Sequence, residues 1–152
     1  MRLAAHRIAL DLPRGWEGRI YRRADEDPIL HAANFALPAT DGDFGSGATA
    51  LMPARGAFVA LKEYRPGPRL TPGAGLFAPR SIPLPLAPGR FHPRALQVGR
   101  AGQAGFQHFF TASGRPFCLY AVIETAAARS ALATGTPDQV DELTRILSTL
   151  AL

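Results

Sequence analysis

The 152-residue sequence contains one cysteine, Cys118, and one lysine, Lys62. A single cysteine cannot form an internal disulfide, which favours a reducing compartment, and its place in an apolar run predicts a buried thiol. No apolar run approaches the roughly 20 residues of a membrane-spanning helix, and the first residues lack the apolar stretch of a signal peptide. We therefore expect a cytoplasmic protein with no membrane span.

The signatures of the common catalytic and cofactor sites are also missing. The sequence has no glycine loop of the Walker or dinucleotide-binding type, no H-E-x-x-H or C-x-x-C spacing and no G-x-S-x-G turn. The acidic residues show no paired spacing typical of glycosidases. These absences favour a protein that is not an enzyme and that carries neither a metal nor a cofactor.

The histidines give one candidate site. None of the four pairs with another histidine or with the cysteine at a spacing typical of metal ligands. His31 and His108 fall in predicted strands, so they could meet on the face of a sheet and form a shared site. The alternative is that each is an ordinary histidine, hydrogen-bonded in the core or at an edge.

Basic residues are concentrated in the middle of the chain. From Arg55 to Arg115 nine basic residues stand against one acid, Glu63, whereas the first 54 residues carry six arginines and seven acids. Such a segment can bind an acidic partner or a polyanion; scattered, solvated arginines are the alternative. Only residues 90–94 interleave basic and aromatic side chains, which argues against nucleic acid as the partner. The candidate binding residues are Arg65, Arg69, Arg80, Arg90, His92 and Arg94.

The last third of the chain carries the clearest structural pattern. Residues 106–111 and 115–124 read as two strands, and Gly114 supplies a turn between them. Both faces of the second strand are apolar, which predicts a central strand covered on both sides. Thr136-Pro137-Asp138-Gln139 has the composition of a helix start. An apolar stripe follows at helical spacing, so we expect this helix to pack on the sheet: Val140, Leu143, Ile146, Leu147 and Leu150.

Several shorter strands are expected upstream, in what we interpret as a single domain covering residues 1–152. Alternation or apolar composition predicts strands over residues 7–12, 18–23, 29–37 and 57–64, with a further strand over 94–99. Residues 48–52 suit either a strand or a helical turn. Trp16, the only tryptophan, is interpreted as a core side chain at the end of the first strand.

A proline-rich segment separates the two halves of the predicted sheet. Eight of the fourteen prolines fall between Pro66 and Pro93, and nothing there supports a helix. We expect an extended, polyproline-like chain that wraps the domain. The alternation of Ile82, Leu84 and Leu86 with prolines suits an edge segment or a lip over the sheet.

Three short stretches carry a family resemblance: Leu12-Pro13-Arg14-Gly15-Trp16 after the first strand, F-F-T-x-x-G-R-P-F-x-L over residues 109–119, and I-L-S-T-L over residues 146–150. In these the chain resembles the PsbP-like superfamily, which includes the Ran-binding Mog protein. The resemblance implies an α+β fold of the α/β/α sandwich type, an antiparallel sheet with helices packed on both faces. It also implies a binding or assembly module. It does not cover the proline-rich middle, and no family binding residue can be matched by position.

Three functional hypotheses follow. The first is a non-catalytic adaptor, monomeric or homodimeric, that binds a protein partner. The second is a small-molecule-binding protein or enzyme with a cavity between the antiparallel sheet and the C-terminal helix. The third is a polyanion-binding protein that uses residues 55–115, with an affinity that falls steeply with salt.

Overall fold

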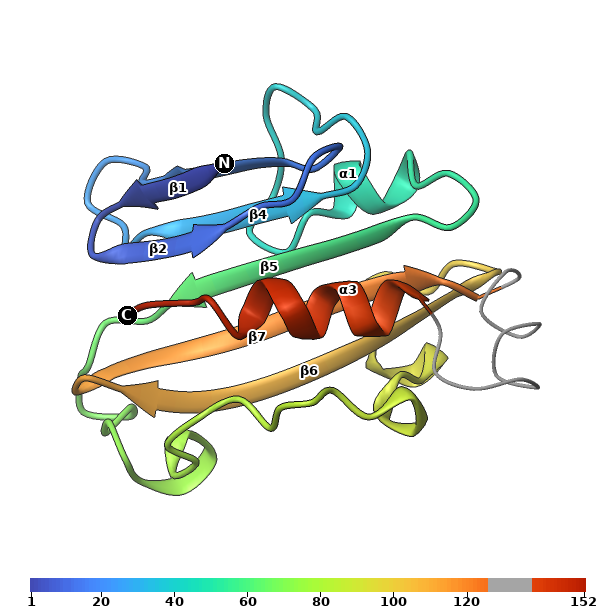
Figure 1. The fold of residues 1–152 in the computed structure, drawn as a ribbon. Helices are drawn as coiled ribbons and strands as arrows, with labels where there is room; N and C mark the ends of the chain where they lie inside the picture. Colours follow the sequence, from blue (N-terminus) through green and yellow to red (C-terminus); the bar gives the residue numbers. More distant parts are fainter. Residues whose placement is uncertain (126–137) are drawn as a thin grey trace.

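The computed structural model describes residues 1–125 and 138–152, with a five-stranded antiparallel sheet at its centre (Figure 1). The strands lie in the order β3–β4–β5–β7–β6. Their bounds are β3 (Glu17–Tyr21), β4 (Ile29–Ala33), β5 (Ala57–Glu63), β6 (Gln103–Ala112) and β7 (Arg115–Glu124). The helices α1 (Ser46–Ala50) and α3 (Asp138–Leu147) complete an α+β fold, which confirms the predicted class. Within the described ranges no helix has the length and apolar character to cross a membrane.

The β6–β7 hairpin forms as the sequence predicted. Ser113 and Gly114 connect the strands with φ angles of 52° and 71°, the left-handed pair of a two-residue hairpin turn. β7 lies between β5 and β6, and its residues are buried from Arg115 to Ile123. Its position confirms the prediction of a central strand covered on both sides.

Helix α3 packs on one face of this sheet, which we call the helix face. Its apolar stripe is buried against side chains of β5 and β7, among them Leu61 and Leu119. The predicted packing is therefore confirmed for the described part of the helix, whereas the expected helix start at Thr136 and Pro137 lies outside the described residues. Trp16 is 7 % exposed and belongs to the same cluster, as expected.

A small hairpin completes the helix face. β1 (Arg2–Ala5) pairs with β2 (Ile8–Asp11), and Ile8 and Leu10 enter the core. The turn consists of His6 and Arg7, both with positive φ (50° and 59°). The sequence predicted β2 but not β1, because neither turn residue is a glycine.

The opposite face, which we call the loop face, is covered by residues 34–52. Helix α1 places Ala48 in a second apolar cluster with Phe58 and Tyr120. Of the two alternatives for residues 48–52, the structure therefore has the helical turn. The strand expected over residues 29–37 ends at Ala33.

Residues 64–102 run along the outer edge of β6 (Figure 1) without an α-helix or a strand of either sheet. The prediction of a strand over residues 94–99 is wrong. Pro93–Ala95 forms a 3-10 turn instead, which suits the fixed φ of proline. Gly105 and His92 exchange two backbone hydrogen bonds, and the Thr111 N–H donates to the Pro79 carbonyl. The segment thus covers β6 at two points of its outer edge.

Candidate functional site

The loop face carries a group of charged and aromatic side chains at its β3 end. Alternation along β3 directs Arg19 and Tyr21 to the loop face, and Arg23 follows two residues later. His31 lies opposite Arg19 in the pairing of β3 with β4, so its side chain shares that face. Lys62 reaches the same face from β5.

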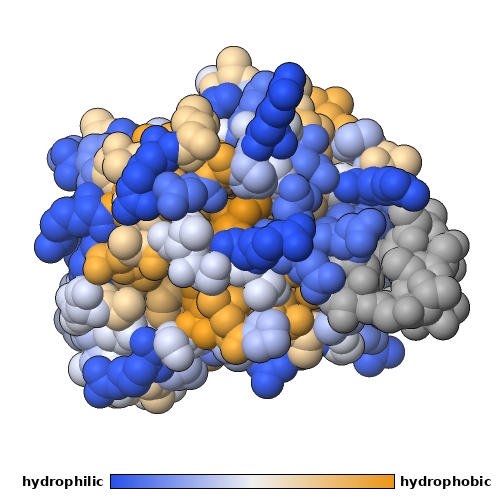
Figure 2. Space-filling model, in the orientation of Figure 1, coloured by the Kyte–Doolittle hydropathy of each residue, from blue (hydrophilic) through white to orange (hydrophobic). Residues whose placement is uncertain are grey.

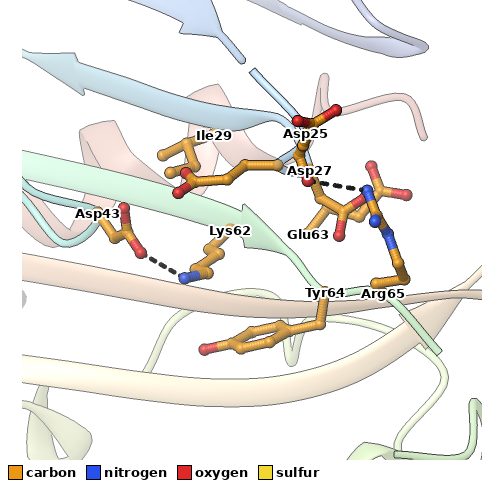
Figure 3. Close-up of a pocket in the computed structure, with 9 residues that line it drawn as sticks. Asp25, Asp27, Ile29, Asp43, Lys62, Glu63, Tyr64 and Arg65 are labelled. Atoms are coloured by element: carbon orange, nitrogen blue, oxygen red, sulfur yellow. Dashed lines mark hydrogen bonds and ion pairs between the residues drawn. The ribbon is translucent and has the colours of Figure 1, made fainter. Parts of the chain in front are cut away.

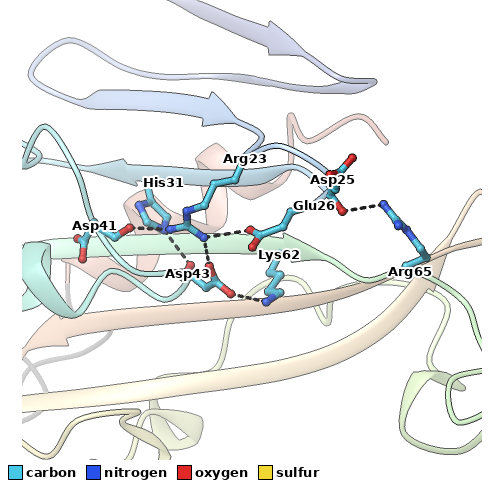
Figure 4. A network of polar contacts seen from close by, with 8 residues as sticks. All are labelled: Arg23, Asp25, Glu26, His31, Asp41, Asp43, Lys62 and Arg65. Carbon is cyan, nitrogen blue, oxygen red and sulfur yellow. Dashed lines mark hydrogen bonds and ion pairs between the residues drawn. The ribbon is translucent and has the colours of Figure 1, made fainter.

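Asp43 holds this group together (Figure 4). Its carboxylate accepts hydrogen bonds from Arg23 Nη1 at 2.5 Å and from the Lys62 ammonium. Burial alone would raise the pKa of Asp43, but the hydrogen bonds from Lys62 and Arg23 outweigh it and hold the pKa below its usual value. Arg23 also pairs with Glu26 at 3.2 Å, so one guanidinium joins two acids.

Asp41 fixes the loop that brings Asp43 to the sheet. Its carboxylate accepts the backbone N–H groups of Gly42, Gly47 and Ala48, each at 2.8 Å, at the start of α1. Gly45 has a φ of 69° and lies against the Phe58 ring, where a Cβ would meet ring carbons within 2.1–2.8 Å. Only glycine fits there, so the loop conformation depends on it.

His31 is the buried member of this group. Its side chain is buried, and Nε2 lies 2.8 Å from the Asp43 carbonyl, to which it donates in the neutral tautomer. The imidazole packs edge-on against the rings of Tyr21 and Phe58, with centroids 5.4 and 5.3 Å away. Burial lowers the pKa of His31, which keeps the ring neutral near pH 7.

Two hollows flank the Arg23–Asp43 pair. One, of about 290 Å³, lies between β3 and the loop at Ala39–Asp41 and is lined by Arg19, Tyr21, Arg23, His31, Ala39, Thr40 and Asp41. The other, of about 340 Å³, lies at the end of β5 and is lined by acidic residues of the β3–β4 loop together with Lys62, Tyr64 and Arg65 (Figure 3). Both open on the loop face, away from α3.

The chain matches no family model, no curated protein and no solved structure.

Arg23, Asp43 and Lys62 are engaged in contacts that hold the structure. The Lys62 ammonium lies 5.2 Å from the centre of the Tyr64 ring and pairs with Asp43. Burial raises the pKa of Tyr64 to about 12 and that of Cys118 to about 11, so neither group is a nucleophile or base near pH 7. Within the described ranges no group of three or more histidine, cysteine or acidic side chains could hold a metal ion.

The structure does not gather the basic residues proposed from the sequence. Arg65 lies at the rim of the second hollow, where it donates to the Asp25 carbonyl and lies 3.7 Å from Asp27. The others are exposed along the segment that follows β5: Arg69, Arg80, Arg90, His92 and Arg94. His92 Nδ1 accepts the backbone N–H of Arg94, a local contact that ends a turn. Figure 2 shows hydrophilic side chains spread over the α3 side of the molecule.

The proposed histidine site does not form. His31 belongs to β4 and faces the loop side, whereas His108 on β6 lies opposite Leu119 and faces the helix side. Two strands separate β4 from β6. His108 Nε2 instead lies 2.9 Å from the Ser81 carbonyl, so the second interpretation, an ordinary hydrogen-bonded histidine, fits each of them.

Sequence reasoning missed the residues that make up the site. The signal for Arg19, Tyr21 and Arg23 was present, because alternate positions in a predicted strand share a face. Nothing in the sequence indicates that Asp43 and Lys62 would meet them, since these residues come from segments that only the sheet order brings together.

Proposed function

We propose that this protein is a non-catalytic binding module and that a protein partner binds along the outer edge of β3. The observation that carries the proposal is the contrast between the two edges of the sheet. The proline-rich segment covers β6, whereas no strand in the described ranges is hydrogen-bonded to the outer edge of β3. Strand β1 contacts β3, with the Leu3 side chain beside Gly18, but does not pair with it. An open strand edge is a template for an added strand.

The register identifies the open groups. Two backbone hydrogen bonds fix the pairing of β4 with β5: the Glu63 N–H donates to the Pro28 carbonyl, and the Asn34 N–H donates to the Ala57 carbonyl. Pro28 and Asn34 flank β4 and are both even-numbered. Because hydrogen-bonded pairs alternate along an antiparallel ladder, the even-numbered residues of β4 bond to β5. The odd-numbered residues of β4 therefore bond to β3, through Arg19 and its odd-numbered neighbours. By the same alternation the peptide groups of Gly18 and Ile20 point outward, and that of Arg22 follows.

The composition beside this edge suits an interface. Arginine and tyrosine are enriched at the centres of protein interfaces, and Arg19, Tyr21 and Arg23 line the hollow directly behind β3. Asp43 and the Asp41 carbonyl hold Arg23, and the Ala39 carbonyl holds Arg19, which lowers the entropy that these two side chains lose on binding.

The resemblance to the PsbP-like superfamily belongs to this proposal. Its sandwich architecture is supported by α3 on the helix face and by α1 on the loop face. A binding or assembly role is what that resemblance implies. The small-molecule alternative has weaker support, because the described part of α3 fills its contact with the sheet by apolar side chains.

The test is photo-crosslinking in cells, with a photoreactive amino acid in place of Thr40 at the mouth of the first hollow. We expect a crosslinked protein from this position and none from the same amino acid in place of Arg90, which is exposed beyond the covered β6 edge. The variant Arg22→Pro should abolish the crosslink and Arg22→Gln should retain it, because both lose the charge and only proline removes an outward N–H. Equal crosslinking from Thr40 and Arg90 would refute the proposal, even if Arg22→Pro did not fold.

A further inference from the structure

We infer that the partner segment is an extended, acidic strand, and that one of its carboxylates binds to Arg19 at the hollow behind β3. This inference rests on the proposed function and adds the chemistry of the partner.

Charge along β3 points to an acidic partner. The strand and the two residues after it carry three arginines, Arg19, Arg22 and Arg23, against one acid, Glu17. Arg23 is committed to Asp43, Glu26 and the Asp41 carbonyl. The Arg19 guanidinium, by contrast, donates through Nη1 to the Ala39 carbonyl at 2.7 Å and has no acidic partner among the described residues. Its remaining N–H groups are free to bind a carboxylate.

Asp41 is the one carboxylate in the lining of the hollow, and its charge does not prevent a second carboxylate from binding there. Both oxygens of Asp41 are held by backbone N–H groups at the start of α1. Its charge is therefore compensated by backbone dipoles. Arg23 is paired with Asp43 and Glu26, so Arg19 is the one arginine of this lining without an acidic partner among the described residues. Because Asp43 and Glu26 lie close by, a single negative charge fits this place better than a doubly charged phosphate does.

Strand geometry places such a carboxylate correctly. In an added antiparallel strand, the residue opposite Arg19 has its side chain on the same face as Arg19, about 4.5–5.5 Å away between Cβ atoms. That face is the loop face, on which the hollow opens between β3 and Ala39–Asp41. A glutamate or aspartate at this position meets the guanidinium, and its neighbours two residues away lie beside Tyr21 and Glu17.

A second copy of this chain is a poorer occupant of the edge. Antiparallel pairing of β3 with itself, centred on Arg19, Ile20 or Tyr21, sets Arg19 opposite Arg19, Tyr21 or Arg23 of the other copy. Arg19 then gains no acidic partner, and like charges across a strand pair are destabilising. Sedimentation of the purified protein tests this directly. A dimer that Arg22→Pro converts to a monomer, while Arg22→Gln does not, would overturn the inference.

The main experiment is an NMR titration of the whole chain with two acetylated, amidated heptapeptides. In one, a single central glutamate is flanked by valine and threonine; in the other, glutamine replaces that glutamate. We expect the glutamate peptide to shift the amides of Gly18 and Ile20 and to bind at least about tenfold more tightly than the glutamine peptide, the effect of a hydrogen bond to a charged group.

Variants separate recognition of the carboxylate from support of the fold. Arg19→Met should abolish the preference for the glutamate peptide, and Arg90→Met should keep it. If Arg19 had only a structural role, Arg19→Met would weaken the binding of both peptides alike and leave the ratio of their affinities unchanged. If both peptides bound the unmodified protein equally and neither bound Arg22→Pro, the inference of an acidic partner would be wrong. The β3 edge would still be the binding surface. Binding of neither peptide, or shifts confined to Gly105 and Thr111, would overturn strand addition itself.

Discussion

Arg115 joins three parts of the chain through one side chain. Nε and Nη2 donate to the two carboxylate oxygens of Glu63 at 2.9 and 2.7 Å. Nη1 and Nη2 also donate to the carbonyls of Arg7 and His6, in the turn between β1 and β2. The ion pair is buried, with the two side chains 9 % and 11 % exposed. A buried, fully hydrogen-bonded pair of this kind is costly to break from one side.

We predict that Arg115→Met destabilises the protein by about 3–5 kcal/mol, because Glu63 is left as a buried charge without its partner. The measurement is chemical denaturation. The double variant that adds Glu63→Gln should recover part of the loss, since the unpaired charge is then removed. If the double variant were no more stable than Arg115→Met, the pair would not be the reason for the loss.

His31 makes the stability depend on pH in a defined range. Its pKa is lowered in the folded state by burial, so the unfolded chain binds the proton more readily. The stabilising contribution is complete above the unfolded pKa of about 6.5 and is lost as pH falls from there toward the folded value. We predict a melting temperature that decreases between pH 7 and pH 5, and a smaller decrease in His31→Gln.

The control for this prediction is His92→Gln, which changes an exposed histidine. Asp43 acts in a different range, because its pKa is lowered and its contribution is lost only as pH falls below about 3.8. A decrease that is the same in His31→Gln as in the unmodified protein would show that His31 is not responsible.

Secondary-structure elements differ in how far their own residues determine them. The β6–β7 hairpin was predictable, because Gly114 marks the turn and both strands are strongly apolar. The β1–β2 hairpin was not, since its turn places His6 and Arg7 at positive φ, where glycine or asparagine is expected. Its carbonyls are held by Arg115, more than 100 residues away, and no local pattern reports such a contact.

Helix α3 gives a direct test of the packing. Leu143 is fully buried between this helix and the sheet. We predict that Leu143→Ala lowers the free energy of unfolding by about 2–5 kcal/mol, because a cavity is left in a packed interface. Arg145→Ala, on the exposed side of the same helix, should change it by well under 1 kcal/mol. Similar losses in the two variants would contradict the orientation of the helix.

For the whole molecule, the sheet order explains why the site could not be predicted. Arg23, Asp43 and Lys62 come from three segments that meet only because β3, β4 and β5 are neighbours and the loop after β4 folds back over them. The sequence allowed the α+β class to be predicted, since periodicity is local. It did not show which face each strand presents to which loop, because pairing and register are long-range properties.

The contrast between the two sheet edges predicts a pattern of amide hydrogen exchange. On β3 the outward N–H groups of Gly18 and Ile20 should exchange much faster than the inward one of Arg19. On β6 the outward N–H groups of Gly105 and Thr111 should be protected, because the proline-rich segment accepts both. Measurement by NMR at neutral pH gives each rate separately. Equal protection of Gly18 and Arg19 would mean that the β3 edge is covered.

The strand order also governs how the sheet is completed during synthesis. β5 is finished at Glu63, but the strand that covers its second edge begins only at Arg115. Translation proceeds from the N-terminus, so β5 is synthesised before β7. While the proline-rich segment is being made, the apolar residues 58–61 of β5 therefore have no strand on the edge that β7 later covers. This interval is when the growing chain is most exposed to pairing with another chain, and the emergence of β7 ends it.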